Sequence, residues 1–214
     1  IMPAFRKSRL HDEKGNLASP AEIVRIPLVC VEAVARLLLG RLPARPLLCY
    51  RATKRLASLL SPSSSVIEFG SGASTTWLAQ RVGSLVSYET EPKWYESVSM
   101  TLRQFKITNT TLVLWKGEIL PHPDTPPNLI IIDGYKRDLC VEYAIDIAGP
   151  QTHIFLDNSD KDMFPPDPQR EMRRSEQLLQ NFANETSRPI EYFSGFAPAQ
   201  LYAEQSMLVG IPDY

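Results

Sequence analysis

The chain has 214 residues, of which 43% are hydrophobic and 22% are charged, and its formal net charge is −1. A chain of this length buries enough surface to fold without a disulfide or metal staple, and its balanced charge creates no general field for nucleic acid or an acidic membrane. Its three cysteines are far apart and form no CxxC or Cys/His cluster, which argues against zinc and favours reduced thiols in a cytoplasmic protein.

The first third of the chain predicts helices without a functional motif. Residues 1–20 are polar, which predicts a loose segment. Helices are predicted over 21–39 and 47–60, and a run rich in proline and glycine separates them. We therefore interpret residues 1–60 as a helical extension of the same domain.

One part of this extension, residues 23–39, is apolar enough to be compared with a membrane span. It contains Arg25, Glu32 and Arg36. Because charges at the centre of a bilayer are costly, the stretch predicts an amphipathic helix and no membrane span.

Residues 61–214 alternate between strand and helix patterns and form the predicted core. Strands are predicted at 66–69, 85–89, 111–115, 129–133, 153–157, 190–194 and 205–211, and helices at 75–82, 92–105, 137–147 and 169–184. Such alternation is typical of βαβ units around a parallel sheet, and the last two strands lack a helix between them. The predicted fold class is α/β: a Rossmann-like, doubly wound, mostly parallel seven-stranded sheet with a C-terminal antiparallel hairpin and extra N-terminal helices.

A glycine-rich motif, Glu-Phe-Gly-Ser-Gly at positions 68–72, follows the first predicted strand. Its glycines, Gly70 and Gly72, allow a tight turn and let the backbone approach a ligand closely. The backbone donors at the start of the next helix then point toward that ligand. Thr75 stands where a GxGxxG motif has its third glycine, so the dinucleotide fingerprint is incomplete.

An acidic residue at the end of the second predicted strand adds to this pattern. Glu89 lies 19 positions after Gly70, a spacing typical of a carboxylate that bonds ribose hydroxyls. Glu91 competes for this role but falls beyond the strand, so Glu89 is preferred. The spacing predicts a ribose-containing ligand at this end of the sheet.

The fourth and fifth predicted strands each end in a carboxylate, Asp133 and Asp157. Ligands of open α/β sheets bind beyond the carboxyl ends of the strands, and parallel neighbours would bring these two side chains close together. Two adjacent carboxylates repel each other unless a cation neutralises them. With the amide oxygen of Asn158 they make a set of hard oxygen ligands, which predicts an Mg²⁺ site.

The first set of motifs resembles class I S-adenosylmethionine-dependent methyltransferases. Glu-x-Gly-x-Gly after the opening strand is similar to their motif I, and Tyr88-Glu89-Thr90 resembles the end of their second strand. The resemblance implies S-adenosylmethionine as cofactor, with Glu68 near its methionine part and Glu89 on the ribose. Tyr135 lies where a narrower group of these enzymes often has an aromatic residue, which implies a position against the adenine. The implied cofactor-binding residues are Glu68, Gly70, Ser71, Gly72, Glu89, Thr90, Gly117, Glu118, Asp133 and Tyr135.

The second set of motifs resembles the catechol and caffeoyl-CoA O-methyltransferase group, whose members have Asp-x-x-Lys after the fourth strand and Asp-Asn after the fifth. This sequence has Asp133-Gly-Tyr-Lys136 and Asp157-Asn158. The resemblance implies direct O-methylation of a small-molecule or glycan-type hydroxyl acceptor, with Asp133 and Lys136 catalytic, Lys136 as general base, and Mg²⁺ held by Asp133, Asp157 and Asn158. The same residues also resemble bacterial-type methyltransferases that use no metal, so both hypotheses stay open.

Two other functions are compatible with parts of the pattern. An NAD(P)-dependent Rossmann oxidoreductase would share the glycine turn and Glu89, but the missing third glycine and the terminal hairpin argue against it. A non-catalytic S-adenosylmethionine-binding module would keep the cofactor residues without turnover. The presence of Glu68, Glu89 and Asp133 together favours an enzyme over such a module.

Overall fold

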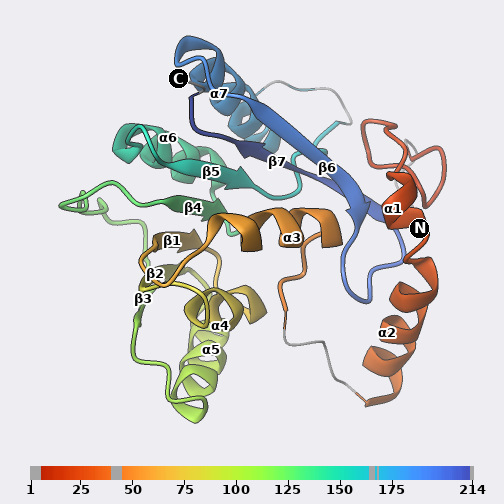
Figure 1. Ribbon diagram of the computed structural model, residues 1–214, viewed down its shortest axis with the longest axis horizontal. Coiled ribbons are helices and arrows are strands. Elements are labelled where there is room, and N and C mark those ends of the chain that lie inside the picture. Colours follow the sequence, from red (N-terminus) through yellow and green to blue (C-terminus); the bar gives the residue numbers. More distant parts are fainter. Residues whose placement is uncertain (1–5, 40–44, 164–166, 168, 213–214) are drawn as a thin grey trace.

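The structure, a computed structural model, describes residues 6–39, 45–163, 167 and 169–212. A single seven-stranded sheet lies at its centre, with helices on both sides (Figure 1). The strands are β1 (Ser65–Phe69), β2 (Ser84–Glu89), β3 (Thr110–Leu114), β4 (Leu129–Ile132), β5 (His153–Leu156), β6 (Ile190–Phe196) and β7 (Ala203–Val209). The helices are α1 (Pro20–Ile23), α2 (Ile26–Leu39), α3 (Tyr50–Leu59), α4 (Ala73–Ala79), α5 (Pro92–Gln104), α6 (Arg137–Ile147) and α7 (Glu171–Glu185).

The strand order is β3-β2-β1-β4-β5-β7-β6, and this topology confirms the predicted fold class. Strands β1 to β5 are parallel, whereas β7 runs antiparallel to both β5 and β6. From β1 the chain first builds outward through β2 and β3, and then returns to place β4 on the other side of β1. This reversal makes the carboxyl ends of β1 and β4 the switch point at which open α/β sheets bind ligands.

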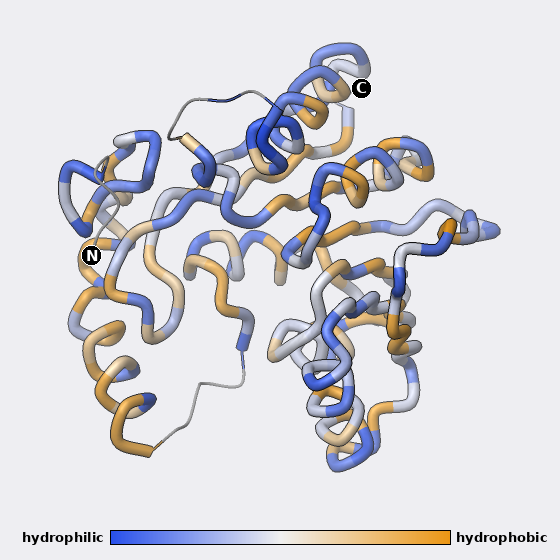
Figure 2. The backbone as a smooth tube through the Cα atoms, turned by 180° about the vertical axis from the view of Figure 1, so that it is seen from behind, coloured by the Kyte–Doolittle hydropathy of each residue, from blue (hydrophilic) through white to orange (hydrophobic). Residues whose placement is uncertain are grey.

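Alternate side chains of the central strands fill two separate cores, one on each face of the sheet. On β4, Ile130 and Ile132 pack with residues of α6 and α7, while Leu129 and Ile131 pack with residues of α3 and α4. All four are almost completely buried, as expected for a strand covered on both faces. In Figure 2 the hydrophobic colour accordingly follows the inner strands.

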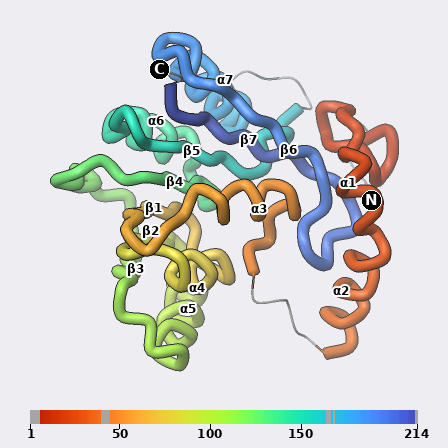
Figure 3. Tube along the Cα trace, viewed as in Figure 1, coloured from red at the N-terminus to blue at the C-terminus, as the bar shows by residue number. Residues whose placement is uncertain are grey.

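The N-terminal segment, residues 6–19, packs against the terminal hairpin, so the prediction of a loose segment was wrong for these residues; residues 1–5 lie outside the described part of the chain. Figure 3 shows the segment beside β6. The carboxylate of Asp12 is fully buried and accepts hydrogen bonds from Ser194 Oγ at 2.7 Å and Gln205 Nε2 at 3.2 Å. Polarity did not predict exposure here, because the polar partners come from strands far away in the sequence.

The predicted helix over 21–39 is present but divided into α1 and α2. Several large apolar side chains of α2, including Val31 and Leu37, are exposed. Within the described residues, none of the helices combines the length and hydrophobicity needed to cross a membrane.

Candidate active site

Two loops meet backbone to backbone at the switch point of the sheet. Gly70, in the loop after β1, has φ +97°, a conformation that side chains with a Cβ rarely adopt. A Cβ on Gly70 would lie 2.7 Å from the backbone nitrogen of Gly134, and one on Gly134 would lie 2.9 Å from the nitrogen of Gly70. The two glycines therefore bring Asp133, at the end of β4, beside the glycine-rich turn.

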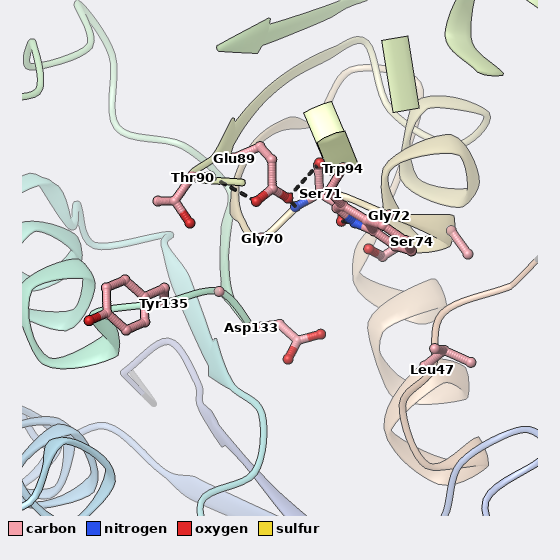
Figure 4. A pocket seen from close by; sticks show the side chains of 12 residues that line it. Leu47, Gly70, Ser71, Gly72, Ser74, Glu89, Thr90, Trp94, Asp133 and Tyr135 are labelled. Carbon is pink, nitrogen blue, oxygen red and sulfur yellow. Dashed lines mark hydrogen bonds between the residues drawn. The ribbon is translucent and has the colours of Figure 1, made fainter. Parts of the chain in front are cut away.

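Glu89 fixes this turn from the end of β2. Its Oε2 accepts hydrogen bonds from the Ser71 nitrogen at 3.0 Å and the Ser71 hydroxyl at 2.8 Å. Its Oε1 accepts from the nitrogens of Thr90 at 2.8 Å and Glu91 at 2.9 Å, and Figure 4 shows the group at one side of a cavity. The indole of Trp94 donates to the carbonyl of Ser71 and restrains the same turn from α5. The carboxylate thus has four donors, three of them backbone N–H groups.

Glu68 lies beneath the turn and is completely buried. Its Oε2 accepts hydrogen bonds of 2.6 Å from the hydroxyls of Thr75 and Ser87, whereas Oε1 has no partner among the described residues. Burial raises the pKa of Glu68 to about 7, against the opposing effect of the neighbouring hydroxyls. Thr75 also accepts a hydrogen bond of 2.8 Å from the nitrogen of Gly72, so the residue in place of the third glycine ties the turn to Glu68.

A cavity of about 350 Å³ opens between these loops (Figure 4). It includes most of the predicted cofactor residues. Its lining consists of Leu47, Gly70, Ser71, Gly72, Ala73, Ser74, Glu89, Thr90, Trp94, Asp133, Gly134 and Tyr135. A smaller cleft beside it, lined in part by Thr90, Trp115 and Tyr135, extends the site toward β3.

The remaining predicted residues lie at the edge of this region or outside it. Gly117 and Glu118 are exposed after β3 and do not line the cavity. Lys136 is exposed as well, and its Nζ lies 3.9 Å from where a Cβ on Gly117 would be. Sequence reasoning missed Leu47 and Trp94, because neither position belongs to a motif. The only available signal for Trp94 was an aromatic side chain in the first turn after Glu89.

Asp133, Asp157 and Asn158 do come together, as predicted, but they lie around Arg137, which belongs to none of the motifs. Arg137 Nη2 donates to Asp133 Oδ1 at 2.9 Å, and Nη1 donates to Asn158 Oδ1 at 3.1 Å and to the carbonyl of Asp157 at 3.0 Å. Asp157 Oδ1 accepts a hydrogen bond of 2.6 Å from Ser206 on β7.

The two carboxyl groups at this position are close enough to influence each other's pKa. Burial raises the pKa of Asp133, and the Arg137 guanidinium opposes this rise. Burial and then the neighbouring Asp133 carboxylate raise the pKa of Asp157 well above its ordinary value. Asp133 lines the cavity and its side chain is 34% exposed, whereas Asp157 is buried, so Asp133 is the member that can contact a ligand.

The expected Mg²⁺ does not fit this arrangement of oxygens. Mg²⁺ would need Asp133 Oδ1 and Asn158 Oδ1 as ligands. Both oxygens already accept hydrogen bonds from the guanidinium of Arg137. In the described part of the chain, no three His, Cys, Asp or Glu side chains are grouped so that they could hold a metal ion.

The chain matches no protein-family model and no curated protein, but its fold matches solved methyltransferases. The O-methyltransferase TomG from Streptomyces achromogenes, in complex with SAM, has a TM-score of 0.62 at 16% identity, over 90% of this chain and 96% of that one. An O-methyltransferase from Bacillus cereus in complex with SAH has a TM-score of 0.60 at 18% identity, over 92% and 94%.

A third match comes from an rRNA methylase of Streptococcus thermophilus, with a TM-score of 0.55 at 17% identity over 77% of this chain and 96% of that one. The chain therefore has the fold of these methyltransferases. Since enzymes with different acceptors share it, the fold does not determine the acceptor or the narrower catechol and caffeoyl-CoA group.

Proposed function

We propose that this protein is an S-adenosylmethionine-dependent methyltransferase that methylates an oxygen of a small-molecule or glycan-type acceptor by direct transfer. The observation that supports the proposal most is the cavity at the switch point, bounded by the glycine-rich turn and Glu89 on one side and Asp133 on the other. Its volume of about 350 Å³ falls in the range of small-molecule sites. Two O-methyltransferases of the same fold are complexes with SAM or SAH, which agrees with this choice of cofactor.

The residues around the cavity fit the parts of this cofactor. Gly70 and Gly72 leave room for close approach to the backbone, Glu89 and Thr90 would hold the ribose, and Tyr135 would cover the adenine. When bound, the cofactor supplies a methyl group on a positively charged sulfur. Glu68, with one unpartnered buried oxygen, lies under the turn where a nearby positive charge would stabilise its ionised form.

On the acceptor side, we assign proton acceptance to Asp133. Its carboxylate lines the cavity and points into it from the loop after β4 (Figure 4). An acceptor hydroxyl group in the cavity can transfer its proton to the Asp133 carboxylate. General-base assistance of this kind raises the reaction rate about 10²- to 10⁴-fold. The resemblance to the catechol-type enzymes predicts Lys136 as the base instead, and a loss of activity in Lys136→Met would favour Lys136 over Asp133 in this role.

Binding of S-adenosylhomocysteine, measured by calorimetry, tests the cofactor assignment. We expect wild-type protein to bind it and Glu89→Ala to bind at least about tenfold more weakly, since tenfold corresponds to the loss of one good polar contact. Glu91→Ala is the matched control, because Glu91 is two residues away, outside β2 and absent from the cavity lining. If folded wild-type protein does not bind the ligand, or if Glu91→Ala weakens binding as much, the assignment is wrong.

A further inference from the structure

Two of the three side chains predicted to hold a metal, Asp133 and Asn158, accept hydrogen bonds from Arg137. Every N–H group of the Arg137 guanidinium has an oxygen partner. Nε donates to the carbonyl of Gly134 at 2.9 Å. Nη1 donates to the carbonyl of Asp157 and to Asn158 Oδ1, and Nη2 donates to the carbonyl and to Oδ1 of Asp133, at 2.9–3.1 Å. A guanidinium has five N–H donors, so this set saturates it.

We propose that Arg137 is the resident cation of the acceptor end of the site and replaces the divalent metal that Asp133, Asp157 and Asn158 would otherwise bind. The inference rests on the proposed function, and it makes methyl transfer by this protein independent of divalent metal. Arg137 is then a positioning residue, which holds Asp133 in a fixed orientation beside the cavity and does not itself contact the acceptor.

The local fold places Arg137 at this point. It is the first residue of α6, four positions after Asp133, and its backbone nitrogen donates to Glu171 Oε1 of α7 at 2.6 Å. Its side chain is only 12% exposed. An arginine held at both its backbone and its guanidinium cannot move away without leaving two carboxyl groups and a buried positive charge uncompensated.

A divalent metal and this guanidinium exclude each other by geometry. Mg²⁺ needs oxygen ligands at about 2.0–2.1 Å in octahedral arrangement. The same Asp133 and Asn158 oxygens lie about 3 Å from nitrogen atoms that occupy the space between them. The positive charges of the two cations would also repel each other at such a short separation.

Binding of Mn²⁺, followed by electron paramagnetic resonance, tests the inference, because carboxylate sites take Mn²⁺ as well as Mg²⁺. We expect wild-type protein to show no site that depends on Asp157. Arg137→Ala should bind Mn²⁺ about tenfold or more tightly than wild type, and the double variant with Asp157→Asn should lose that gain. Arg174→Ala, which removes an arginine paired with surface carboxylates on α6, should behave as wild type.

Thermal unfolding gives a second readout. Arg137→Ala should have a lower Tm than wild type, and added Mg²⁺ should raise the Tm of the variant but leave that of wild type unchanged. A purely structural role of Arg137 would lower the Tm without this rescue.

Three results would overturn the inference. One is a wild-type Mn²⁺ site that Asp157→Asn removes, and this measurement decides the matter even if Arg137→Ala does not fold. Another is wild-type methyl transfer that a chelator stops and Mg²⁺ restores. The third is a folded Arg137→Ala protein that binds Mn²⁺ no better than wild type. Calorimetry with S-adenosylhomocysteine separates these outcomes from a failure of the proposed function, which would show as no ligand binding.

Discussion

The two ends of the cavity stabilise their carboxylates in different ways. At the end of β2, Glu89 receives all four hydrogen bonds from residues 71–91, three of them from backbone nitrogens. At the ends of β4 and β5, the carboxyl groups depend on two side chains, the guanidinium of Arg137 and the hydroxyl of Ser206, which comes from β7. The first end is thus built by local backbone geometry, and the second by a cation and by contacts distant in the sequence.

If backbone geometry builds the cofactor end, the largest effect should come from a methyl group added to the glycine turn. Gly70→Ala would require φ +97° from alanine and would place a Cβ 2.7 Å from Gly134. Backbone strain and overpacking each cost about 1–3 kcal/mol. We therefore expect a loss of about 3 kcal/mol or more in the free energy of unfolding, measured with urea.

Gly72→Ala is the control for that variant. Gly72 has an extended backbone, with φ 172°, and a Cβ there would meet no atom closer than 3.6 Å, the distance to the Trp94 indole nitrogen. We expect its stability to stay within about 1 kcal/mol of wild type, as ordinary substitutions do. Equal losses in the two variants would show that the contact between Gly70 and Gly134 does not organise the turn.

The next effect concerns the buried carboxyl group under the turn. The pKa of Glu68 rises from 4.5 to about 7 on folding, so between these values the folded protein keeps a proton that the unfolded chain has lost. The contribution of this group to stability is therefore complete below pH 4.5 and declines as the pH rises through 7. The loss amounts to at most about 3 kcal/mol, at about 1.4 kcal/mol per pKa unit.

Glu68→Gln should abolish this part of the pH dependence, because the amide is neutral at every pH and can still accept from Thr75 and Ser87. The measurement is the free energy of unfolding of both proteins from pH 5 to 8. The difference between the variant and wild type should grow with pH, in favour of the variant. Glu118→Gln, at an exposed position, should follow the wild-type curve, and parallel curves for Glu68→Gln would refute the raised pKa.

The same contrast explains what the sequence could predict. The alternation of strands and helices, the switch point and the position of Glu89 follow from periodicity and short spacings, and the sheet confirms the predicted fold. The packing of Asp12 against Gln205 joins residues 193 positions apart, so polarity alone indicated exposure. Arg137 was also missed. The Asp-x-x-Lys and Asp-Asn motifs identify residues that can bind a cation, but they do not show that the positive charge comes from a nearby arginine side chain.

The smallest effect should come from Ser71, and it tests how Glu89 binds its ligand. Each of the two carboxylate oxygens of Glu89 already accepts two hydrogen bonds, so all four lone-pair positions of the carboxylate are occupied. Of the four donors, only the Ser71 hydroxyl can rotate away, so a ribose hydroxyl should replace it. Ser71→Ala then frees one acceptor position on Glu89 Oε2 and keeps the hydrogen bond from the backbone nitrogen of residue 71.

We expect calorimetry to show that Ser71→Ala binds S-adenosylhomocysteine within about twofold of wild type, or more tightly. In wild type the ribose hydroxyl must displace the Ser71 hydroxyl from Glu89, a hydrogen bond of about 1 kcal/mol net, and in the variant that bond is absent from the start. Glu89→Ala, in contrast, should lose most of the affinity. If Ser71→Ala weakens binding tenfold, the Ser71 hydroxyl contacts the ligand directly, and the end of β2 would then depend on a side chain in the way that the ends of β4 and β5 do.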